Sequence, residues 1–261
     1  MQARLIPMRS PIGGPDTSLP AGAHTDDGWA GSALWHYHDM HQLLYAFEGT
    51  VEMEGVQGHY KVPRQFAMWI PAGAVHRAAT QRHASGSIYF APELLPCTMA
   101  APRVIPAPAL LREMVMHAMR WPLEREDDDV SAAYFPCLAR LCENWITEDV
   151  KLLLPATTEP RITAIMAYTN AHLAAVTLPD VCQHANMTAR TLRRQFTKST
   201  GISWEEYRQR LRLSLALNAL DQTNQSIGEI AAIVGYENQA AFARAFRAIL
   251  GMAPREYRAQ A

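Results

Sequence analysis

Three histidines and a glutamine in the N-terminal half have the types and spacing of a binding site. His36, His38 and Gln42 lie close together, and His76 follows a Pro-Ala-Gly turn at residues 71–73. Residues i and i+2 of a strand face the same side, so His36 and His38 would point together into a barrel, with His76 opposite them. Three converging imidazoles suit Zn, Fe, Ni or Cu, with Gln42 as a weak oxygen donor.

The alternative is that these histidines bind no metal and form hydrogen bonds to a small organic effector or to one another. We favour this alternative, because Gln42 carries no charge that would balance a divalent cation. Tyr45 and Trp69, together with Trp35 and Tyr89, are expected to line the pocket or to fill the core of the barrel. Two other histidines, His41 and His59, are expected at the surface.

A second set of chemically active residues is cationic and lies in the C-terminal part. Arg190, Arg193, Arg194 and Lys198 project away from the face that Leu192 and Phe196 share on a predicted helix. Arg244 and Arg247 repeat this arrangement later in the chain, opposite Phe242 and Phe246. A positive face opposite an apolar one is typical of a helix that enters the major groove of DNA, where long donors reach phosphates and guanine edges.

The charge of the chain is divided unequally between its two parts. The 261 residues carry 24 Lys and Arg against 25 Asp and Glu, a net charge of −1. Residues 161–261 nevertheless hold 12 bases and 7 acids, a net charge of +5, which leaves −6 for residues 1–160. A basic part beside an acidic one is typical of proteins that bind nucleic acid with the basic part.

Composition excludes several classes of protein. With 49% hydrophobic and 19% charged residues, the chain is too apolar to be intrinsically disordered. Cys97, Cys137, Cys142 and Cys182 form no CxxC pair, which argues against a disulfide framework and against structural zinc. Residues 1–17 lack the apolar core of a signal peptide, and no apolar run is long enough for a membrane span. We therefore expect a cytoplasmic protein with no membrane partner.

Short strands must position the histidines. Between residues 29 and 95, alternating apolar runs are broken by Gly and Pro at regular intervals, as in a sandwich or barrel of antiparallel strands. A proline-rich connector leads to two predicted helices, residues 109–121 and 132–149, on either side of an acidic loop at residues 124–129. Their apolar residues recur every three or four positions, which predicts core packing or, alternatively, contact with a second copy of the chain.

Two helix-turn-helix segments must position the cations. In residues 178–199, a short helix ends before Asn186, and Thr188 caps the next helix. In residues 226–250, a capping serine begins the first helix and Gly235 ends it. A helix over residues 203–221, with Trp204, Tyr207, Leu211 and Leu215 on one side, is expected to act as a rigid spacer. Two recognition helices on this spacer would enter successive major grooves ~34 Å apart.

These C-terminal segments resemble a known family. TLRRQFTKSTGISWEEYRQRLRL and IGEIAAIVGYENQAAFARAFRAILGMAPREYR are similar to the paired helix-turn-helix domain of the AraC/XylS transcriptional regulators. The second string carries I-A-x-x-x-G-Y, F-x-R-x-F-R and G-x-x-P-x-x-Y-R in the family's order and spacing. The resemblance covers residues 160–258 without a gap.

The resemblance implies DNA contacts at individual positions. Its base-reading positions fall on Arg190, Arg193 and Arg194 in the first segment and on Gln239, Ala240 and Arg244 in the second. Ala240 departs from the pattern, because alanine offers only its methyl group to a thymine. Any single arginine more often contacts a phosphate than a base. The full predicted DNA-contacting set is Thr188, Arg190, Arg193, Arg194, Lys198, Asn238, Gln239, Ala240, Arg244 and Arg247, and the predicted helix-turn-helix core is Phe196, Ile230, Phe242, Phe246 and Tyr257.

The N-terminal segments GSALWHYHDMHQLLYAFEG and PRQFAMWIPAGAVH resemble the two halves of a cupin signature. The first half has Gln42 where enzymatic cupins usually have glutamate, and one residue fewer after Gly31. The likeness is better to the sugar-binding barrel that precedes the helical domain in AraC-type regulators. A metal-dependent cupin enzyme, an oxygenase or isomerase with an added helical domain, is the alternative function.

The sequence thus predicts an α+β multi-domain protein that is not an enzyme. Residues 1–98 form a cupin-like effector barrel, residues 99–158 a helical linker, and residues 159–261 a DNA-binding domain. The predicted function is a ligand-responsive regulator of transcription, more often an activator than a repressor in this family. Its predicted partners are promoter DNA, RNA polymerase, a small-molecule effector in the pocket of His36, His38, Gln42, Tyr45, Trp69 and His76, and a second copy bound through residues 109–149. No cofactor is required.

Overall fold

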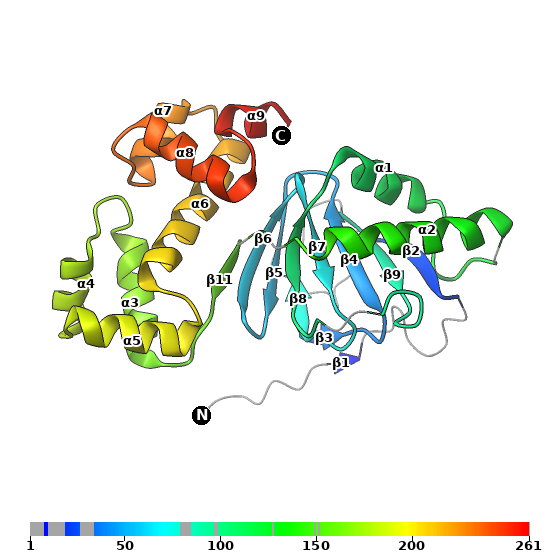
Figure 1. Ribbon diagram of the computed structural model, residues 1–261, viewed down its shortest axis with the longest axis horizontal. Helices are drawn as coiled ribbons and strands as arrows, with labels where there is room; N and C mark the ends of the chain where they lie inside the picture. Colours follow the sequence, from blue (N-terminus) through cyan, green and yellow to red (C-terminus); the bar gives the residue numbers. More distant parts are fainter. Residues whose placement is uncertain are drawn as a thin grey trace. The chain divides into compact units, whose positions relative to one another are not determined.

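The chain forms a β-rich N-terminal unit and a helical C-terminal unit (Figure 1). This computed structural model describes residues 8–9, 19–26, 34–78, 85–96, 99–126, 128–148, 150 and 152–260. The first unit contains Met1–Val56 and Tyr60–Val150, and the second contains Lys151–Ala261 together with Gln57–His59. The α+β fold class predicted from the sequence is confirmed.

Two sheets make up the N-terminal unit. The first runs from β1 (Met8–Arg9) through β3 (His36–Tyr37), β8 (His76–Ala78) and β5 (Thr50–Gly55) to β6 (Gly58–Pro63). The second has the order β10 (Arg103–Pro106), β7 (Phe66–Ile70), β4 (His41–Ala46), β9 (Ser85–Phe90) and β2 (Ala21–Asp26). Apart from the parallel pair of β1 and β3, the recorded neighbours are antiparallel, which fits the short alternating runs of the sequence.

The second sheet is covered on both faces. Every residue of β4, β7 and β9 is buried, whereas β5 of the first sheet alternates between buried and half-buried positions. On one face, Leu43, Trp69 and Phe90 share a hydrophobic core with residues of two helices. On the other face, the Tyr89 ring lies 5.1 Å from that of His38, which directly follows β3 of the first sheet. Cover on both sides explains why these strands read as continuous apolar runs.

The two helices of this cover are α1 (Ala109–Ala118) and α2 (Asp129–Trp145), and Figure 1 shows them beside the second sheet. The predicted helix over residues 132–149 begins earlier than expected. The Asp128 carboxylate accepts hydrogen bonds from the backbone N–H groups of Val130 and Ser131. The end of the acidic run is therefore a helix cap, because a carboxylate there satisfies amides that have no partner within the helix.

The apolar stripes of α1 and α2 divide between core and surface. Leu111, Val115 and Ala118 of α1 are buried in the core that α2 and the second sheet share. Leu110 and Met116, by contrast, are each 54% exposed. One side of α1 is therefore buried in the core, as the first alternative predicted. The exposed apolar side chains on the rest of α1 are the ones that could contact a second copy of the chain, as in the second alternative.

The C-terminal unit begins with a short strand and continues as helices. Strand β11 (Leu153–Pro155) lies beside residues 57–59, because the Ala156 N–H donates to the Gln57 carbonyl at 3.0 Å. The helices are α3 (Pro160–Ala171), α4 (Leu178–Ala185), α5 (Ala189–Thr200), α6 (Trp204–Gln222), α7 (Ile227–Ile233), α8 (Gln239–Leu250) and α9 (Pro254–Gln260).

Helix α6 lies between the two helix-turn-helix groups within this unit (Figure 1). Trp204, Tyr207 and Leu211 in its N-terminal half pack in a core with α3, α4 and α5. Leu217 and Leu220, in its C-terminal half, are also buried. Leu215, which was predicted on the same side of the helix as Trp204, Tyr207 and Leu211, is 38% exposed. The helix is therefore a shared core element, and not only a spacer.

Some sequence predictions lie outside the described residues. They concern Cys97, Gly31 of the first cupin-like segment, and most of residues 1–17. Asp149, at the end of the second predicted linker helix, lies outside them as well. Among the helices of the described ranges, none combines the length and apolar character that a membrane span requires.

Candidate functional site

The first helix-turn-helix is built by local hydrogen bonds. Thr177 and Asp180 form a reciprocal capping box at the start of α4. Asn186 then adopts the left-handed conformation with a φ of 50°, and the Thr188 hydroxyl accepts from the Thr191 N–H to cap α5. Because these capping hydrogen bonds all join groups within a few residues of one another, the short sequence is enough to fix the turn between the helices.

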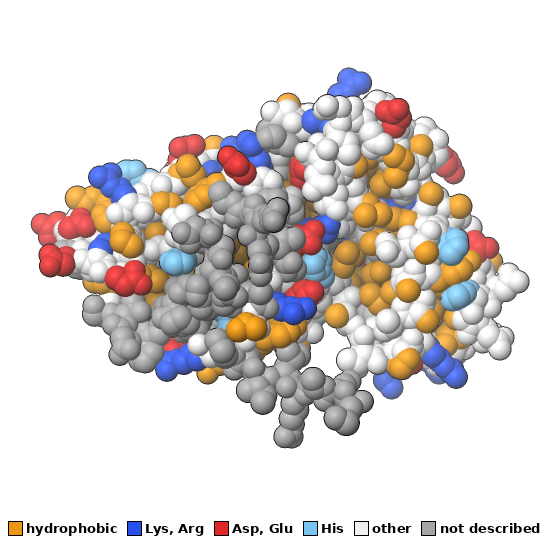
Figure 2. Space-filling model, turned by 180° about the vertical axis from the view of Figure 1, so that it is seen from behind, with side chains coloured by type: hydrophobic (Ala, Val, Ile, Leu, Met, Phe, Trp, Pro, Cys, Tyr) orange, Lys and Arg blue, Asp and Glu red, His pale blue; other side chains and the backbone are white. Residues whose placement is uncertain are grey.

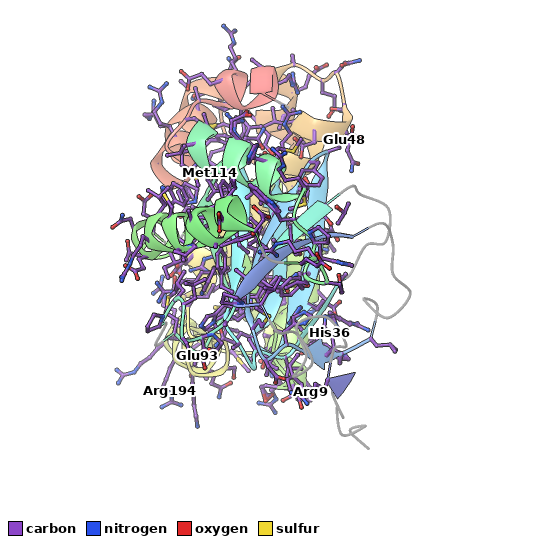
Figure 3. The ribbon with its side chains drawn as sticks, turned by 90° about the vertical axis from the view of Figure 1, so that its right-hand side faces the viewer. Arg9, His36, Glu48, Glu93, Met114 and Arg194 are labelled. Carbon is purple, nitrogen blue, oxygen red and sulfur yellow. The ribbon has the colours of Figure 1, made fainter. Side chains whose placement is uncertain are left out.

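Helix α5 presents its cations on the outside. Leu192 and Phe196 are fully buried beneath it, whereas Arg190, Arg194 and Lys198 are exposed. These three form no ion pair with any residue in the described part of the chain. Figure 3 labels Arg194, whose side chain extends away from the ribbon. In Figure 2, Lys and Arg side chains line the edge of the C-terminal unit where α5 runs in Figure 1.

Arg193 differs from its neighbours on α5. Its guanidinium forms an ion pair of 3.0 Å with the Glu205 carboxylate in the first turn of α6, and its Nε also donates to that group at 3.1 Å. The pair ties α5 to α6, so Arg193 holds the recognition helix as well as carrying charge at its surface. The spacing of the arginines gave no sign of this partner.

The second helix-turn-helix repeats the pattern. Ser226 and Glu229 form the capping box of α7, and the side-chain oxygen Oδ1 of Asn238 accepts from the Ala241 N–H at 2.9 Å to cap α8. Phe242 and Phe246 are buried under α8. Its outer side exposes Gln239, Ala240, Arg244 and Arg247, of which Arg247 lies 3.6 Å from Glu256. The residues predicted to form the helix-turn-helix core are all buried, namely Phe196, Ile230, Phe242, Phe246 and Tyr257.

A close contact fixes the two groups relative to each other. Gly235 ends the turn after α7 with a φ of +85°, and a Cβ atom there would lie 2.4 Å from the Ala174 carbonyl oxygen of the first group. The Arg212 guanidinium of α6 lies 5.2 Å from the Tyr236 ring centroid and donates to the Leu173 carbonyl at 3.4 Å. Gly235 and Tyr236 therefore seat the second group against the loop that follows α3.

The sequence analysis did not identify the arginines that contribute to this contact between the two groups. Arg208 and Arg212 were not singled out, yet Arg208 donates to the Val176 carbonyl at 2.8 Å and Arg212 bridges the two groups. Burial lowers the pKa of the Arg212 guanidinium, and the charge of Arg208 lowers it further. The fixed fork of an arginine suits this role, because one face can stack on an aromatic ring while the N–H groups reach carbonyls. The only sequence signal was the run of arginines at every second position of the helix.

The N-terminal histidines converge as predicted from their spacing. His36 in β3 lies directly opposite His76 in β8, and His38 follows two residues after His36. The ring centroids are 4.4 Å apart for His36 and His76, 5.0 Å for His36 and His38, and 5.2 Å for His38 and His76. The three side chains are 5%, 4% and 3% exposed in chain order. Figure 3 labels His36 near Arg9, whose strand pairs with β3.

Hydrogen bonds orient two of the rings. His36 Nδ1 lies 2.7 Å from the Leu34 carbonyl oxygen, and His76 Nδ1 lies 2.8 Å from that of Ala74. A carbonyl can only accept, so both Nδ1 atoms carry the proton. Burial lowers the pKa of His76 to about 3, and the neighbouring His36 and His38 lower it further. The imidazole is therefore neutral at physiological pH.

Two of the residues predicted for the pocket lie elsewhere. Tyr45 and Trp69 belong to the core between the second sheet and α1 and α2, on the face opposite to the histidines. Burial raises the pKa of Tyr45, which also interacts with Arg112 of α1. The assignment of Tyr45 and Trp69 to the same pocket as His36 is therefore corrected. On β4, Tyr45 is three residues from Gln42, and an odd separation places two side chains on opposite faces of a strand.

Gln42 does face the histidine side of the sheet. It pairs with Tyr89, whose ring contacts His38, and side chains of directly opposed residues share a face. Its Nε2 donates to the Ser87 hydroxyl at 2.7 Å, while its buried Oε1 has no hydrogen-bond partner among the described residues. The prediction of a surface position for His41 was wrong. His41 is buried against the Trp69 ring at 5.2 Å, and its Nδ1 accepts from the Ala72 N–H.

The linker helices carry a shallow pocket at the surface. It has a volume of about 510 Å³ and is lined by Glu113, Met114, Met116, His117 and Tyr134. The Tyr134 hydroxyl donates to the Met114 carbonyl, which joins α2 to α1 beneath the pocket. Met116, which lines the pocket, and Leu110 are both exposed apolar residues of α1.

The sequence of this chain is similar to those of known helix-turn-helix proteins. A family profile described as a helix-turn-helix domain matches residues 181–260. The transcriptional regulator NimR of Escherichia coli K12 is 27% identical over 232 residues, which are 85% of this chain and 81% of NimR. The transcriptional activator AarP of Providencia stuartii is 34% identical over 98 residues, which are 37% of this chain and 73% of AarP.

Solved structures are also similar to part of the chain. The C-terminal domain of AraT, a response regulator from Geobacillus stearothermophilus, is 29% identical and covers 41% of this chain and 89% of its own, with a TM-score of 0.39. The DNA-binding domain of AdpA, solved with a target DNA, is 27% identical and covers 38% of this chain and 91% of its own, with a TM-score of 0.37.

Proposed function

Because the chain belongs to the AraC/XylS family of helix-turn-helix transcriptional regulators, we propose that it reads a promoter with α5 and α8 together. One observation carries the proposal. Both helices are capped at their N-termini, anchored by buried phenylalanines, and leave arginines exposed on the outer side. Arginines on such a face reach phosphates and the edges of guanines, whereas the buried side sets the angle of the helix in the groove.

The residues proposed to contact DNA divide by role. Arg190, Arg194 and Arg244 are exposed and form no ion pair within the described residues, so they are assigned to bases and phosphates. Arg193 is assigned to a phosphate, because Glu205 already orients its guanidinium. Thr188 and Asn238 cap their helices and lie where helix N-termini approach a backbone phosphate. Lys198, Gln239, Ala240 and Arg247 complete the set.

The test begins with selection of bound duplexes from a random DNA library. Binding to the selected site is then measured at several salt concentrations for the Arg194→Ala/Arg244→Ala double variant. We expect a loss of affinity of at least about 10-fold and a shallower salt dependence, since each lost phosphate contact lowers the slope by about one. The matched control is Arg161→Ala/Arg255→Ala, which removes the same charge from exposed positions outside α5 and α8. Equal losses in both variants would contradict the assignment.

We propose further that the N-terminal unit binds an effector that controls the DNA-binding unit. The buried histidines and Gln42 are polar groups in an otherwise apolar interior, and a few converging polar groups in apolar surroundings are typical of small-molecule binding sites. RNA polymerase is the proposed partner at the promoter, with activation as the proposed outcome, because AarP and the RhaR and RhaS proteins are named as activators. The protein is proposed to act in the cytoplasm, where promoter DNA is.

A second copy of the chain is the proposed partner of the linker helices. Leu110 and Met116 are large apolar side chains exposed on α1, beside a shallow pocket. The test is sedimentation velocity of Leu110→Glu/Met116→Glu, which should shift a dimer to a monomer because a dimer would bury the added charges. Val56→Glu, at another exposed apolar position, is the control. A wild-type protein that stays monomeric at micromolar concentration would exclude this contact.

A further inference from the structure

In each helix-turn-helix group, an arginine of the recognition helix is held by a carboxylate of the next helix. Arg193 of α5 forms an ion pair of 3.0 Å with Glu205, in the first turn of α6. Arg247 of α8 lies 3.6 Å from Glu256, in the first turn of α9. Arg247 belongs to the last turn of its helix, whereas Arg193 lies before the last turn of α5. The same arrangement therefore occurs twice, at positions that are not copies of each other.

The two ion pairs lie at the surface, where they add little to the stability of the fold. The side chains of Arg193 and Glu205 are 56% and 39% exposed, and those of Arg247 and Glu256 are 61% and 55% exposed. Water and salt screen such charges, so an exposed pair is weak and separates at small cost. The pairs therefore affect mainly how the two arginines reach an anion outside the protein.

The ion pair of Arg193 uses only one edge of its guanidinium. Nε donates to Oε1 of Glu205 at 3.1 Å, and Nη2 lies 3.0 Å from the same oxygen. A guanidinium carries five N–H groups in a planar fork, so this contact leaves both N–H groups of Nη1 and one of Nη2 on the other edge. That edge can bind a phosphate while Glu205 keeps the side chain in one orientation.

Other arginines of the recognition helices are not held in this way. Arg190, Arg194 and Arg244 are exposed and form no ion pair within the described ranges. A mobile arginine can reach a phosphate of any duplex, because the backbone charge is independent of sequence. A held arginine meets a phosphate only where the DNA backbone passes its fixed position, and the path of the backbone depends on the sequence.

We propose that Glu205 and Glu256 are specificity-determining residues for DNA binding. Each carboxylate holds an arginine of a recognition helix and thereby weakens binding to unrelated DNA more than binding to the target site. This inference rests on the proposed function, because it places both carboxylates beside the DNA-reading helices. A carboxylate beside such a surface repels phosphates, and a repulsive element raises specificity when only the correct partner can offset it.

The test compares the selected duplex with a duplex of scrambled sequence, and it measures the ratio of the two dissociation constants at one salt concentration. Glu205→Gln removes the charge and keeps the size of the side chain. We expect it to tighten binding to the scrambled duplex by at least about 3-fold and to the selected duplex by less, because the freed arginine can then reach any phosphate. Glu256→Gln should also lower the selectivity, and its amide oxygen can still accept from the Ala253 N–H.

Glu237→Gln is the matched control. Glu237 is an exposed acid directly before the Asn238 cap of α8, and it forms no ion pair with any described residue. Its replacement removes the same charge and should change the affinity for both duplexes by the same factor. In the Arg193→Ala variant, adding Glu205→Gln should leave the ratio unchanged, because the carboxylate then has no arginine to hold.

The outcomes separate this inference from the proposed function. A selective wild type whose ratio is the same after Glu205→Gln, or changes equally after Glu237→Gln, would overturn the inference alone. An effect of Glu205→Gln that persists in the Arg193→Ala variant would also overturn it, because repulsion of phosphates would then be a sufficient cause. A wild type that binds both duplexes equally would contradict the proposed function, and the inference would fall with it.

Discussion

At the scale of single residues, a glycine and a tyrosine explain the most specific string of the C-terminal segment. Gly235 adopts a positive φ and approaches the Ala174 carbonyl so closely that a side chain would overlap it. Tyr236 stacks beneath Arg212, which also reaches the Leu173 carbonyl. Gly235 and Tyr236 therefore form the contact between the two helix-turn-helix groups. This role requires no contact with DNA.

Gly235→Ala is expected to destabilise the protein more than the same change at Gly201. Both glycines have a positive φ, +85° and +76°, so both substitutions carry backbone strain of about 1–2 kcal/mol. At Gly201 no atom of the described residues lies within 4 Å of the added Cβ, whereas at Gly235 the Ala174 oxygen must move. Urea unfolding of the two variants measures the difference. Equal losses of stability would show that the contact with Ala174 carries no energy.

The cysteines are expected to differ in reactivity. Burial raises the pKa of the Cys142 thiol to about 12, whereas Cys137, on the same helix, is exposed. Thiolate is the reactive form, so the native protein should be alkylated by iodoacetamide at Cys137 and protected at Cys142. Peptide mass spectrometry before and after unfolding in urea checks this order. Equal labelling in the native protein would mean that α2 is not packed as described.

At the scale of elements, the helix-turn-helix groups owe their precision to their caps. Helix α7 has only seven residues, and a helix that short is marginal without end groups and packing. The capping box of Ser226 and Glu229 satisfies amides at its start, and Ile227, Ile230 and Ala231 are buried beneath it. The position of α8 depends on this helix, since the turn between them is short.

Ser226→Ala is expected to cost about 1 kcal/mol of stability, because an N-cap side chain is lost while the surface is otherwise unchanged. Ser226→Asn should restore most of it, since asparagine caps about as well as serine. Chemical denaturation followed by circular dichroism compares the three proteins. If asparagine fails to rescue, the loss belongs to something other than the hydrogen bond to Glu229.

At the scale of the whole molecule, the chain divides into two units with separate cores. The second sheet shares one core with α1 and α2, and α3 to α6 share another. The division falls at residue 150, except that Gln57–His59 group with the C-terminal unit. A regulator needs such a division, because the part that binds the effector must be able to change without unfolding the part that binds DNA.

The fragment 152–261 is expected to fold without the rest of the chain. Its helices keep their core, including the buried hydrogen bond of 3.0 Å from Trp204 Nε1 to the Thr169 hydroxyl. Strand β11 should fray, because it loses the hydrogen bond between Ala156 and Gln57, although Arg210 still donates to the Leu153 carbonyl. Amide hydrogen exchange should therefore show protected helices and rapid exchange at Leu153–Pro155. An unfolded fragment would show that the units depend on each other.

Much of this protein was determined by its sequence alone. The caps at Thr188 and Ser226, the turns at Asn186 and Gly235, and the buried phenylalanines of both groups were all predicted and are all present. These features depend on hydrogen bonds and periodicity within a few residues, so spacing encodes them directly. The convergence of His36 and His38 has the same origin, because residues two apart on a strand share a face.

Other features were decided only by the tertiary structure. Tyr45 and Trp69 went to the helix side of the second sheet, Arg193 took Glu205 as a partner, and His41 was buried against Trp69. The odd spacing between Gln42 and Tyr45 shows that their side chains lie on opposite faces of the strand. It does not show which sheet or helix packs against each face. Such contacts join residues far apart in the chain, and their free energy depends on packing that local sequence does not specify.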